Sequence, residues 1–326
     1  MTSRQKARRI DTLLLLGLPA SGKSEVRRHM STVSPEVAES DFHLGPTVQL
    51  DDFPYVHFMV RISEVMEDLG HEPAFWESGR ERFRDLRDLG TLVHLLNEDY
   101  AALNATRVPA VRSPGKWIVD RLDTARRLAR MPGPFSLLDE GDRTAVVAAI
   151  EDEAALFAAE WSVRSRPPGS TVVIEFARGG PEGSNLPLDP PHGYAHSLSL
   201  LSAEILRRAA VLYLWVTPED SRRRNQERAR PGEEGSILHH GVPETVMRAY
   251  YGIDDMEWLI DQSGQPGTIT VRAHESTFHL PIARFDNRRH LTLFQPDHST
   301  ASPSRQDEEV HAALREAFAG LVTHPA

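Results

Sequence analysis

Residues 12–24 read TLLLLGLPASGKS, a short apolar run that leads directly into a glycine-rich loop. The loop itself, residues 17–24, matches the pattern GxxxxGK[S/T] in full. Glycines at both ends allow such a loop to wrap backbone N–H groups around phosphate oxygens, and the helix that follows adds its positive N-terminal end. The apolar run predicts a buried strand and residues 25–30 predict a helix. The stretch therefore predicts a strand–loop–helix unit that binds nucleotide phosphate.

Two side chains of this loop have distinct predicted roles. Lys23 would bridge the β- and γ-phosphates of a bound nucleotide, and the Ser24 hydroxyl would complete the coordination of Mg²⁺. A nucleoside triphosphate, ATP or GTP, and Mg²⁺ are therefore the expected cofactors; the loop itself does not distinguish the two bases, and ATP is favoured below by the missing GTPase motif and by resemblance. The positions predicted to bind the nucleotide are Gly17, Pro19, Ala20, Ser21, Gly22, Lys23 and Ser24.

Short runs typical of strands alternate with stretches of helical period along the chain. In residues 55–69 the apolar side chains recur every three or four positions, and Gly70 is placed to end that helix. Strands that alternate with helices predict an α/β fold with a doubly wound, five-stranded parallel sheet. The five predicted strands are residues 12–16, 47–50, 171–176, 211–216 and 268–271.

The second and third predicted strands are separated by a long segment of helical period. It predicts a mainly helical insertion at residues 71–166, within a single domain that spans 1–326, and this insertion would build the pocket for the phosphoryl acceptor. Its predicted helical stretches are residues 80–105, 118–129 and 142–163. Residues 218–245 begin with a clear helix start and are rich in arginine, and their place after the fourth predicted strand resembles the lid of nucleotide kinases.

The composition excludes several classes of protein. Cysteine is absent, which removes disulfides, thiolate nucleophiles and cysteine-ligated zinc. The formal net charge of −10 argues against a nucleic-acid coat or a membrane-surface binder, so nucleic acid is not an expected partner. No apolar run approaches the ~18 residues of a membrane helix. Residues 4–16 mimic an export signal, but Gly17 and Pro19 interrupt the apolar stretch, so we expect a cytoplasmic protein.

The loop sequence GLPASGKS close to the N-terminus resembles that of the P-loop NTPases, and most of all the small-molecule and nucleotide kinases among them. The resemblance covers the loop and the core strands, about half of the chain. A guanine-reading NKxD motif, which a GTPase would carry, is absent. The third predicted strand ends in IEFAR (residues 174–178) instead of the Asp-Glu pair of ATPase motors. Both observations favour a kinase.

An acidic pair follows the second predicted strand. Asp51-Asp52-Phe53-Pro54 resembles the Asp-Asp-Phe-Tyr type of sequence in uridine kinase and phosphoribulokinase relatives, where an aspartate beside the γ-phosphate contacts the acceptor hydroxyl. A hydroxyl acceptor benefits from a carboxylate that orients it and takes its proton, whereas two anions would repel a phosphate acceptor. We therefore predict a catalytic Asp51 and a substrate-binding Asp52, with a helix N-cap as the alternative for Asp52.

Four further residues complete the predicted site. Glu175 lies at the carboxyl end of an apolar strand, where doubly wound folds bind ligands, and it is predicted to hold Mg²⁺ or to contact the acceptor. Arg178 is predicted to bind substrate, and an ion pair with Glu175 is the alternative. Arg224 and Arg228 share a helix face. Their place resembles the lid of nucleotide kinases, which implies that they clamp the transferring phosphoryl group; the alternative is a solvated basic face.

These observations predict an ATP- and Mg²⁺-dependent kinase that phosphorylates a hydroxyl group of a small or nucleoside-like acceptor. A nucleoside monophosphate kinase is the nearest alternative. A nucleotide-switched protein that binds a protein or RNA partner is the alternative from another class. The sequence identifies neither the acceptor nor the oligomeric state, and no membrane partner is expected.

Overall fold

The computed structural model describes residues 9–77, 79, 81–105, 110–136, 138–228, 242–289, 291 and 305–322, and the chain divides into two compact units. Unit 1 comprises Met1–Gln49, Pro167–Ser199 and Ala203–Ala326, and unit 2 comprises Leu50–Arg166 and Leu200–Ser202. The predicted insertion, residues 71–166, lies within unit 2, which begins earlier, at Leu50.

A six-stranded sheet forms the centre of unit 1, with the strand order β2-β5-β1-β6-β8-β7. β1 is parallel to both β5 and β6, and β6 is parallel to β8. The apolar runs of β1, β5 and β6 are almost entirely buried, as expected for strands that are covered on both faces. The α/β class with a mostly parallel sheet is therefore confirmed. The strands are β1 (Thr12–Leu16), β2 (Thr47–Asp51), β5 (Thr171–Phe176), β6 (Ala209–Trp215), β7 (Thr268–Ala273) and β8 (Ser276–Asp286).

The prediction of five parallel strands is wrong in two respects. The sheet has a sixth strand, β8, and the strand predicted at 268–271 is the antiparallel partner of β8 at the edge of the sheet. Pro281 and the charged residues of β8 obscure its pattern in the sequence. His274 and Glu275 join the two strands with φ angles of 51° and 57°, the backbone geometry of a tight hairpin turn.

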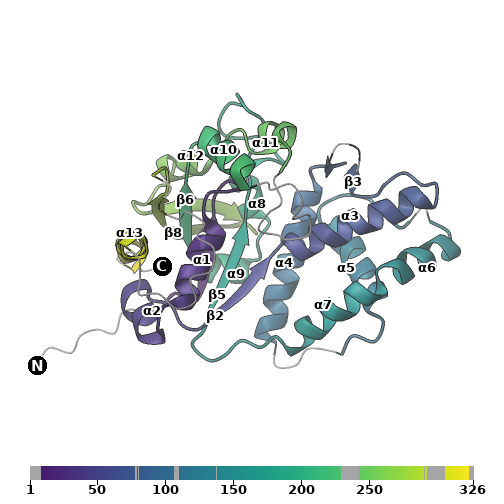
Figure 1. Ribbon diagram of the computed structural model, residues 1–326, viewed down its shortest axis with the longest axis horizontal. Helices are drawn as coiled ribbons and strands as arrows, with labels where there is room; N and C mark the ends of the chain where they lie inside the picture. The colour runs from purple at the N-terminus through teal and green to yellow at the C-terminus, as the bar shows by residue number, and fades with distance from the viewer. Residues whose placement is uncertain are drawn as a thin grey trace, which may run out of the picture. The chain divides into compact units, whose positions relative to one another are not determined.

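Helices cover both faces of this sheet (Figure 1). On one face, α1, α2 and α13 share a core with alternate residues of the strands, among them Leu13 and Leu15 of β1 and Phe318 of α13. On the other side, α9 contacts β8, while α8 and α12 contact β7. The helices of unit 1 are α1 (Lys23–Thr32), α2 (Pro35–Phe42), α8 (Gly193–Ser199), α9 (Ala203–Arg208), α10 (Pro218–Arg228), α11 (Glu244–Tyr250), α12 (Met256–Asp261) and α13 (Arg305–Val322).

Unit 2 is mainly helical. Gly70 ends its first helix in the left-handed conformation (φ 83°), as predicted. The beginning of the predicted helix at 80–105 forms part of a short hairpin instead, and the predicted stretch 142–163 is divided at Ile150 into two helices. The elements are α3 (Phe53–Asp68), β3 (Trp76–Glu77), β4 (Arg82–Phe83), α4 (Asp88–Asn104), α5 (Pro114–Leu128), α6 (Glu140–Ala149) and α7 (Glu151–Val163). Across the described part of the chain, no helix is long and apolar enough to cross a membrane.

Candidate functional site

The glycine loop, residues 17–24, joins β1 to α1 at the carboxyl end of β1. After β1 the chain continues to β2, which lies on one side of β1 in the sheet. After β6 it continues to β7 and β8, which lie on the opposite side. The direction in which strands are added therefore reverses beside this loop. Open α/β sheets bind ligands at such a point. Gly22 precedes α1 with a φ of 102°, a conformation that side chains other than glycine rarely adopt. A Cβ on Gly17 would lie 2.6 Å from the carbonyl oxygen of Leu214, so this turn also requires glycine.

Three side chains from different elements hold the backbone of the glycine loop. The phenol oxygen of Tyr194, on α8, accepts a hydrogen bond from the N–H of Gly17 at 2.8 Å. The Ser221 hydroxyl, on α10, donates to the carbonyl of Pro19 at 2.7 Å. Asn287, which follows β8, donates from its side-chain amide to the carbonyl of Ser21 at 2.8 Å. The loop is therefore fixed along its length before any ligand binds.

The ammonium of Lys23 lies across the loop. It donates hydrogen bonds to the carbonyl oxygens of Gly17 at 2.9 Å and of Leu18 at 3.1 Å. The residue is only 8% exposed, so a charged group is held close to the loop backbone in a largely buried place. This arrangement offers positive charge to an anion that lies in the loop.

The glycine loop also presents donors that its own fold does not use. Within the described part of the chain, the backbone N–H groups of Ala20, Gly22 and Ser24 donate no hydrogen bond. The buried hydroxyl of Ser21 has no hydrogen-bond partner there either. A phosphate group would supply acceptors for donors of this kind at a helix N-terminus, so the residues present fit a nucleotide phosphate.

The two residues predicted to serve Mg²⁺ lie on neighbouring elements. Ser24 is the second residue of α1 and partly exposed. Glu175, one residue before the end of β5, lies 3.3 Å from the guanidinium of Arg27, one turn further along α1. Among the described residues, no group of three or more histidine and acidic side chains could hold a metal ion by itself. A Mg²⁺ ion here would depend on Ser24, Glu175, nucleotide phosphates and water, which is the usual pattern for this ion.

Arg178 follows β5 and is 2% exposed. Its guanidinium lies 4.9 Å from the ring centre of Phe176 and donates to the carbonyl of Ala177 at 2.7 Å. Its backbone also hydrogen-bonds the phenol oxygen of Tyr194, the same atom that accepts from Gly17. The glycine loop and the end of β5 are therefore tied to one side chain.

The two predicted clamp arginines are placed differently from each other. Arg224 is 4% exposed, and its guanidinium donates to the carbonyls of Asn287 at 2.7 Å and Arg288 at 3.2 Å, so it supports the backbone beside Asn287. Burial lowers the pKa of Arg224 from its usual value. Arg228 is less buried and lies 3.4 Å from Glu25 in the first turn of α1. The rest of the predicted lid, residues 229–241, lies outside the described residues.

The predicted site residues of unit 1 are thus linked to the glycine loop by hydrogen bonds and ion pairs through α1, Tyr194 or Asn287. No protein-family model matches this chain, and no match to it is found among the curated proteins. The chemistry of the site is therefore inferred from its geometry alone.

Asp51 and Asp52 belong to unit 2, where α3 begins. Asp51 is the last residue of β2, and its carboxylate accepts a hydrogen bond from the N–H of Phe53 at 3.1 Å. Asp52 occupies the N-cap position of α3, but its side chain makes no capping hydrogen bond. The capping bond that was the alternative role for Asp52 is therefore not formed, and the bond from Phe53 to Asp51 is a local turn contact before the helix.

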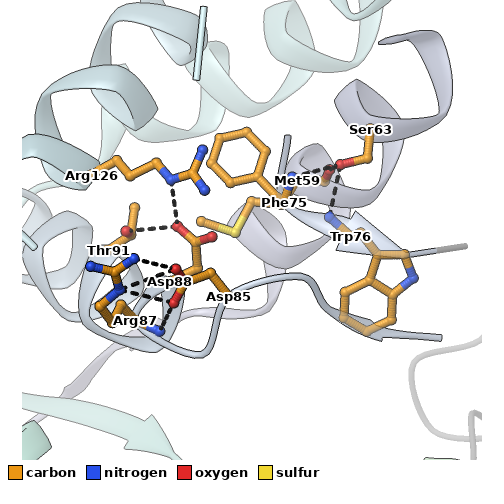
Figure 2. A network of polar contacts seen from close by, with 9 residues as sticks. All are labelled: Met59, Ser63, Phe75, Trp76, Asp85, Arg87, Asp88, Thr91 and Arg126. Carbon is orange, nitrogen blue, oxygen red and sulfur yellow. Dashed lines mark hydrogen bonds and ion pairs between the residues drawn. The ribbon is translucent and has the colours of Figure 1, made fainter. Parts of the chain in front are cut away.

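Unit 2 also contains the fully buried acidic residue Asp88, which the sequence analysis did not single out (Figure 2). Thr91 donates to this carboxylate at 3.0 Å, and the guanidinium of Arg126 lies 3.2 Å from it. Burial raises the pKa of Asp88 to about 7. The guanidinium of Arg126 also lies 5.0 Å from the ring centre of Phe75. Asp88 is fully buried, so this cluster stabilises the unit without presenting a surface to a ligand.

Sequence reasoning missed the three residues that anchor the glycine loop. Tyr194, Ser221 and Asn287 carry no motif and are distant in the chain. The only signal for Ser221 and Asn287 is their place after the carboxyl ends of β6 and β8, where ligand sites of α/β sheets form. Tyr194 lies in a short helix whose position against the loop could be found only in three dimensions.

Proposed function

We propose that this protein is an ATP- and Mg²⁺-dependent P-loop kinase that transfers the γ-phosphoryl group to a hydroxyl of a small or nucleoside-like acceptor. The observation that carries the proposal is the glycine loop. The backbone N–H groups of the loop that donate no hydrogen bond lie at the N-terminal end of α1, together with the ammonium of Lys23. This end of the helix is beside the point where the strand order reverses. Each of these features favours a bound phosphate.

The use of lysine in this chain supports the same proposal. The sequence contains only three lysines, Lys6, Lys23 and Lys116, although lysine and arginine together number 37. Arginine therefore fills nearly every basic position, yet the glycine loop holds a lysine. A compact ammonium can bond two loop carbonyls and still reach a phosphate, whereas the planar guanidinium is larger and its donors have a fixed direction.

The residues of the chain have separate tasks in the proposed reaction. Backbone N–H groups of the loop and Lys23 bind the phosphates, and Asp51 orients the acceptor hydroxyl and takes its proton. The acceptor oxygen bonds to the γ-phosphorus as the bond from that phosphorus to the β–γ bridging oxygen breaks, which leaves ADP. Ser24 and Glu175 would hold a Mg²⁺ ion, which when bound would neutralise phosphate charge. Arg228 would neutralise the transferred group from α10, and Arg178 would contact the acceptor.

The test is transfer from γ-labelled ATP with Mg²⁺ to pooled nucleosides, nucleotides, sugars, aminoglycosides and short RNA. Lys23→Ala should lower transfer at least a hundredfold because phosphate stabilisation is lost. Lys116→Ala is the matched control, since Lys116 pairs with Asp120 on the exposed side of α5 and should leave the rate unchanged. A Lys23→Ala rate within tenfold of wild type would overturn the proposal.

Asp51→Asn then separates the acceptor classes. A hydroxyl kinase should lose orders of magnitude in rate because the acceptor proton has no carboxylate to receive it. A nucleoside monophosphate kinase should keep much of its rate, since a phosphate acceptor needs no base. Tight nucleotide binding with no transfer to any pool would instead favour the nucleotide-switched binding protein.

A further inference from the structure

Tyr194 occupies an unusual place for a buried tyrosine. The residue is fully buried in α8, and within the described part of the chain its phenol oxygen bonds backbone groups: the N–H of Gly17 at 2.8 Å and the backbone of Arg178. Gly17 begins the glycine loop, and Arg178 follows the strand that carries Glu175. One oxygen atom therefore joins the two segments that hold the proposed nucleotide and substrate residues of unit 1.

A second buried residue fixes Tyr194 itself. The carboxylate of Asp255, which is fully buried before α12, accepts hydrogen bonds from the N–H groups of Tyr194 at 2.6 Å and Ala195 at 3.0 Å. A Cβ on Gly193 would lie 2.5 Å from this carboxylate, and the φ of Gly193 is 79°. Asp255 thus holds the first turn of α8 tightly, so the phenol has little freedom to move away from the loop.

We infer that Tyr194 is a positioning residue for the glycine loop, and that it sets the place of Gly17 relative to the end of β5. Its role rests on the proposed function, because the loop that it holds is the proposed phosphate site. The phenol stays neutral, since burial raises its pKa well above the usual value. The neutral phenol can therefore accept the hydrogen bonds from the backbone that the structure shows.

Tyr194→Phe tests this role because it removes one oxygen atom and keeps the ring. Tyr213→Phe is the matched control. Tyr213 is equally buried, on β6, but its phenol donates to the carboxylate of Asp254 at 3.0–3.1 Å, and among the described residues it forms no hydrogen bond with the glycine loop. Tyr194→Phe loses two bonds to neutral backbone groups and Tyr213→Phe loses one bond to a carboxylate, so both variants should lower the melting temperature by a similar amount.

Nucleotide affinity should separate the two variants. We expect Tyr194→Phe to raise the dissociation constant of Mg²⁺–ATP about tenfold, because the N–H of Gly17 at the start of the loop and the backbone of Arg178 after β5 lose their common partner. Tyr213→Phe should change it less than twofold. Equal effects in the two variants, or no effect of Tyr194→Phe, would overturn the inference. The purified full-length chain is used throughout.

Amide hydrogen exchange in the absence of nucleotide keeps the inference independent of the proposed function. In Tyr194→Phe, peptides that cover residues 17–24 should exchange several-fold faster than in Tyr213→Phe, while peptides from unit 2 stay unchanged. If the wild-type protein binds no nucleotide, the proposed function fails, and this exchange still decides the role of Tyr194. Identical exchange over residues 17–24 in both variants would show that Tyr194 does not position the loop.

Discussion

The two units bury polar side chains for different purposes. In unit 1, Tyr194, Ser221 and Asn287 each bond the backbone of the glycine loop. In unit 2, the largest buried polar side chains bond one another, although Ser63 accepts hydrogen bonds from the backbone N–H groups of Phe75 and Trp76 (Figure 2). The guanidinium of Arg121 bonds the carboxylate of Asp99 at 2.7 Å and the phenol of Tyr55 at 2.9 Å.

The network in unit 2 is also closed by aromatic rings. Trp161 donates from its indole N–H to Asp99 at 2.8 Å, and the guanidinium of Arg121 lies 4.6 Å from the ring centre of Trp117. Tyr55 donates to Asp99 at 2.5 Å, and burial raises the pKa of this phenol well above its usual value.

Helices satisfy their own backbone, so buried polar groups between them must pair among themselves. A loop lacks internal partners, and side chains must hold it. Side chains that bond loop backbone are therefore a better guide to a site than buried charge.

The largest expected effect is on the stability of unit 2. Arg121→Met should lower the free energy of unfolding by about 3–5 kcal/mol, because it leaves the carboxylate of Asp99 buried without its cation. Denaturant unfolding followed by tryptophan fluorescence measures this change. The control is Arg61→Met, whose partly exposed pair with Glu64 should contribute less than about 1 kcal/mol. If Arg121→Met lowered the free energy of unfolding by less than about 1 kcal/mol, the comparison between the two units would be contradicted. It would also be contradicted if Arg121→Met weakened nucleotide binding as strongly as Lys23→Ala does.

The next effect concerns the pH dependence of stability. Asp88 has a pKa of about 7 in the folded protein, well above the 3.8 of an unperturbed carboxyl, so the folded state binds its proton more tightly between pH 4 and 7. This group therefore contributes stability that is present at low pH and is lost as the pH rises to about 7. Between pH 4.5 and pH 8, wild type should lose about 3 kcal/mol more than Asp88→Asn, at about 1.4 kcal/mol for each pH unit in that window.

Asp85→Asn provides a control of opposite sign. Hydrogen bonds from Arg87 lower the pKa of Asp85, so its contribution is present above pH 4 and is lost as the pH falls further. Asp85→Asn should therefore change the free energy of unfolding only at the acid end of the pH series. Denaturant unfolding at a series of pH values measures both variants, and parallel curves for wild type and Asp88→Asn would contradict the role of Asp88.

The smallest expected effect compares two serines that each bond a backbone carbonyl. Ser221→Ala removes the hydrogen bond to Pro19 in the glycine loop, whereas Ser162→Ala removes a bond within α7 to Ala158 at 2.6 Å. Each should lower stability by about 1 kcal/mol or less. Only Ser221→Ala should weaken Mg²⁺–ATP binding, by about three- to fivefold, measured by calorimetry. Equal binding by both variants would argue against loop anchoring by Ser221.

Local sequence patterns predicted most of the individual elements. The bounds of β1 and β5 agree with the apolar runs, and Thr217 caps α10 through a hydrogen bond from Asp220 N–H at 3.1 Å. Burial on both faces and helix capping depend on neighbouring residues, so they leave a signal in a short stretch. β8 was missed because it contains Pro281 and alternates poorly, and its place beside β6 is decided by pairing across the sheet.

The candidate site was predicted less completely than the fold. The glycine loop was evident because its donors are consecutive in the chain. The supporting role of Arg224 was not, since an arginine in a basic helix gives no sign of whether it faces solvent or the backbone of Asn287. Glu175 was expected at the end of its strand, but its pairing with Arg27 depends on how α1 packs beside β5.

The sequence by itself determined the α/β class, the glycine loop and its single lysine, because periodicity, glycine spacing and charge are properties of contiguous residues. Tertiary structure alone decided the strand order and brought Tyr194, Ser221 and Asn287 to one loop. The loop has no regular hydrogen bonding of its own, so its backbone groups must find partners elsewhere in the chain. Those partners come from three connections after three different strands, and no local pattern records where such connections meet.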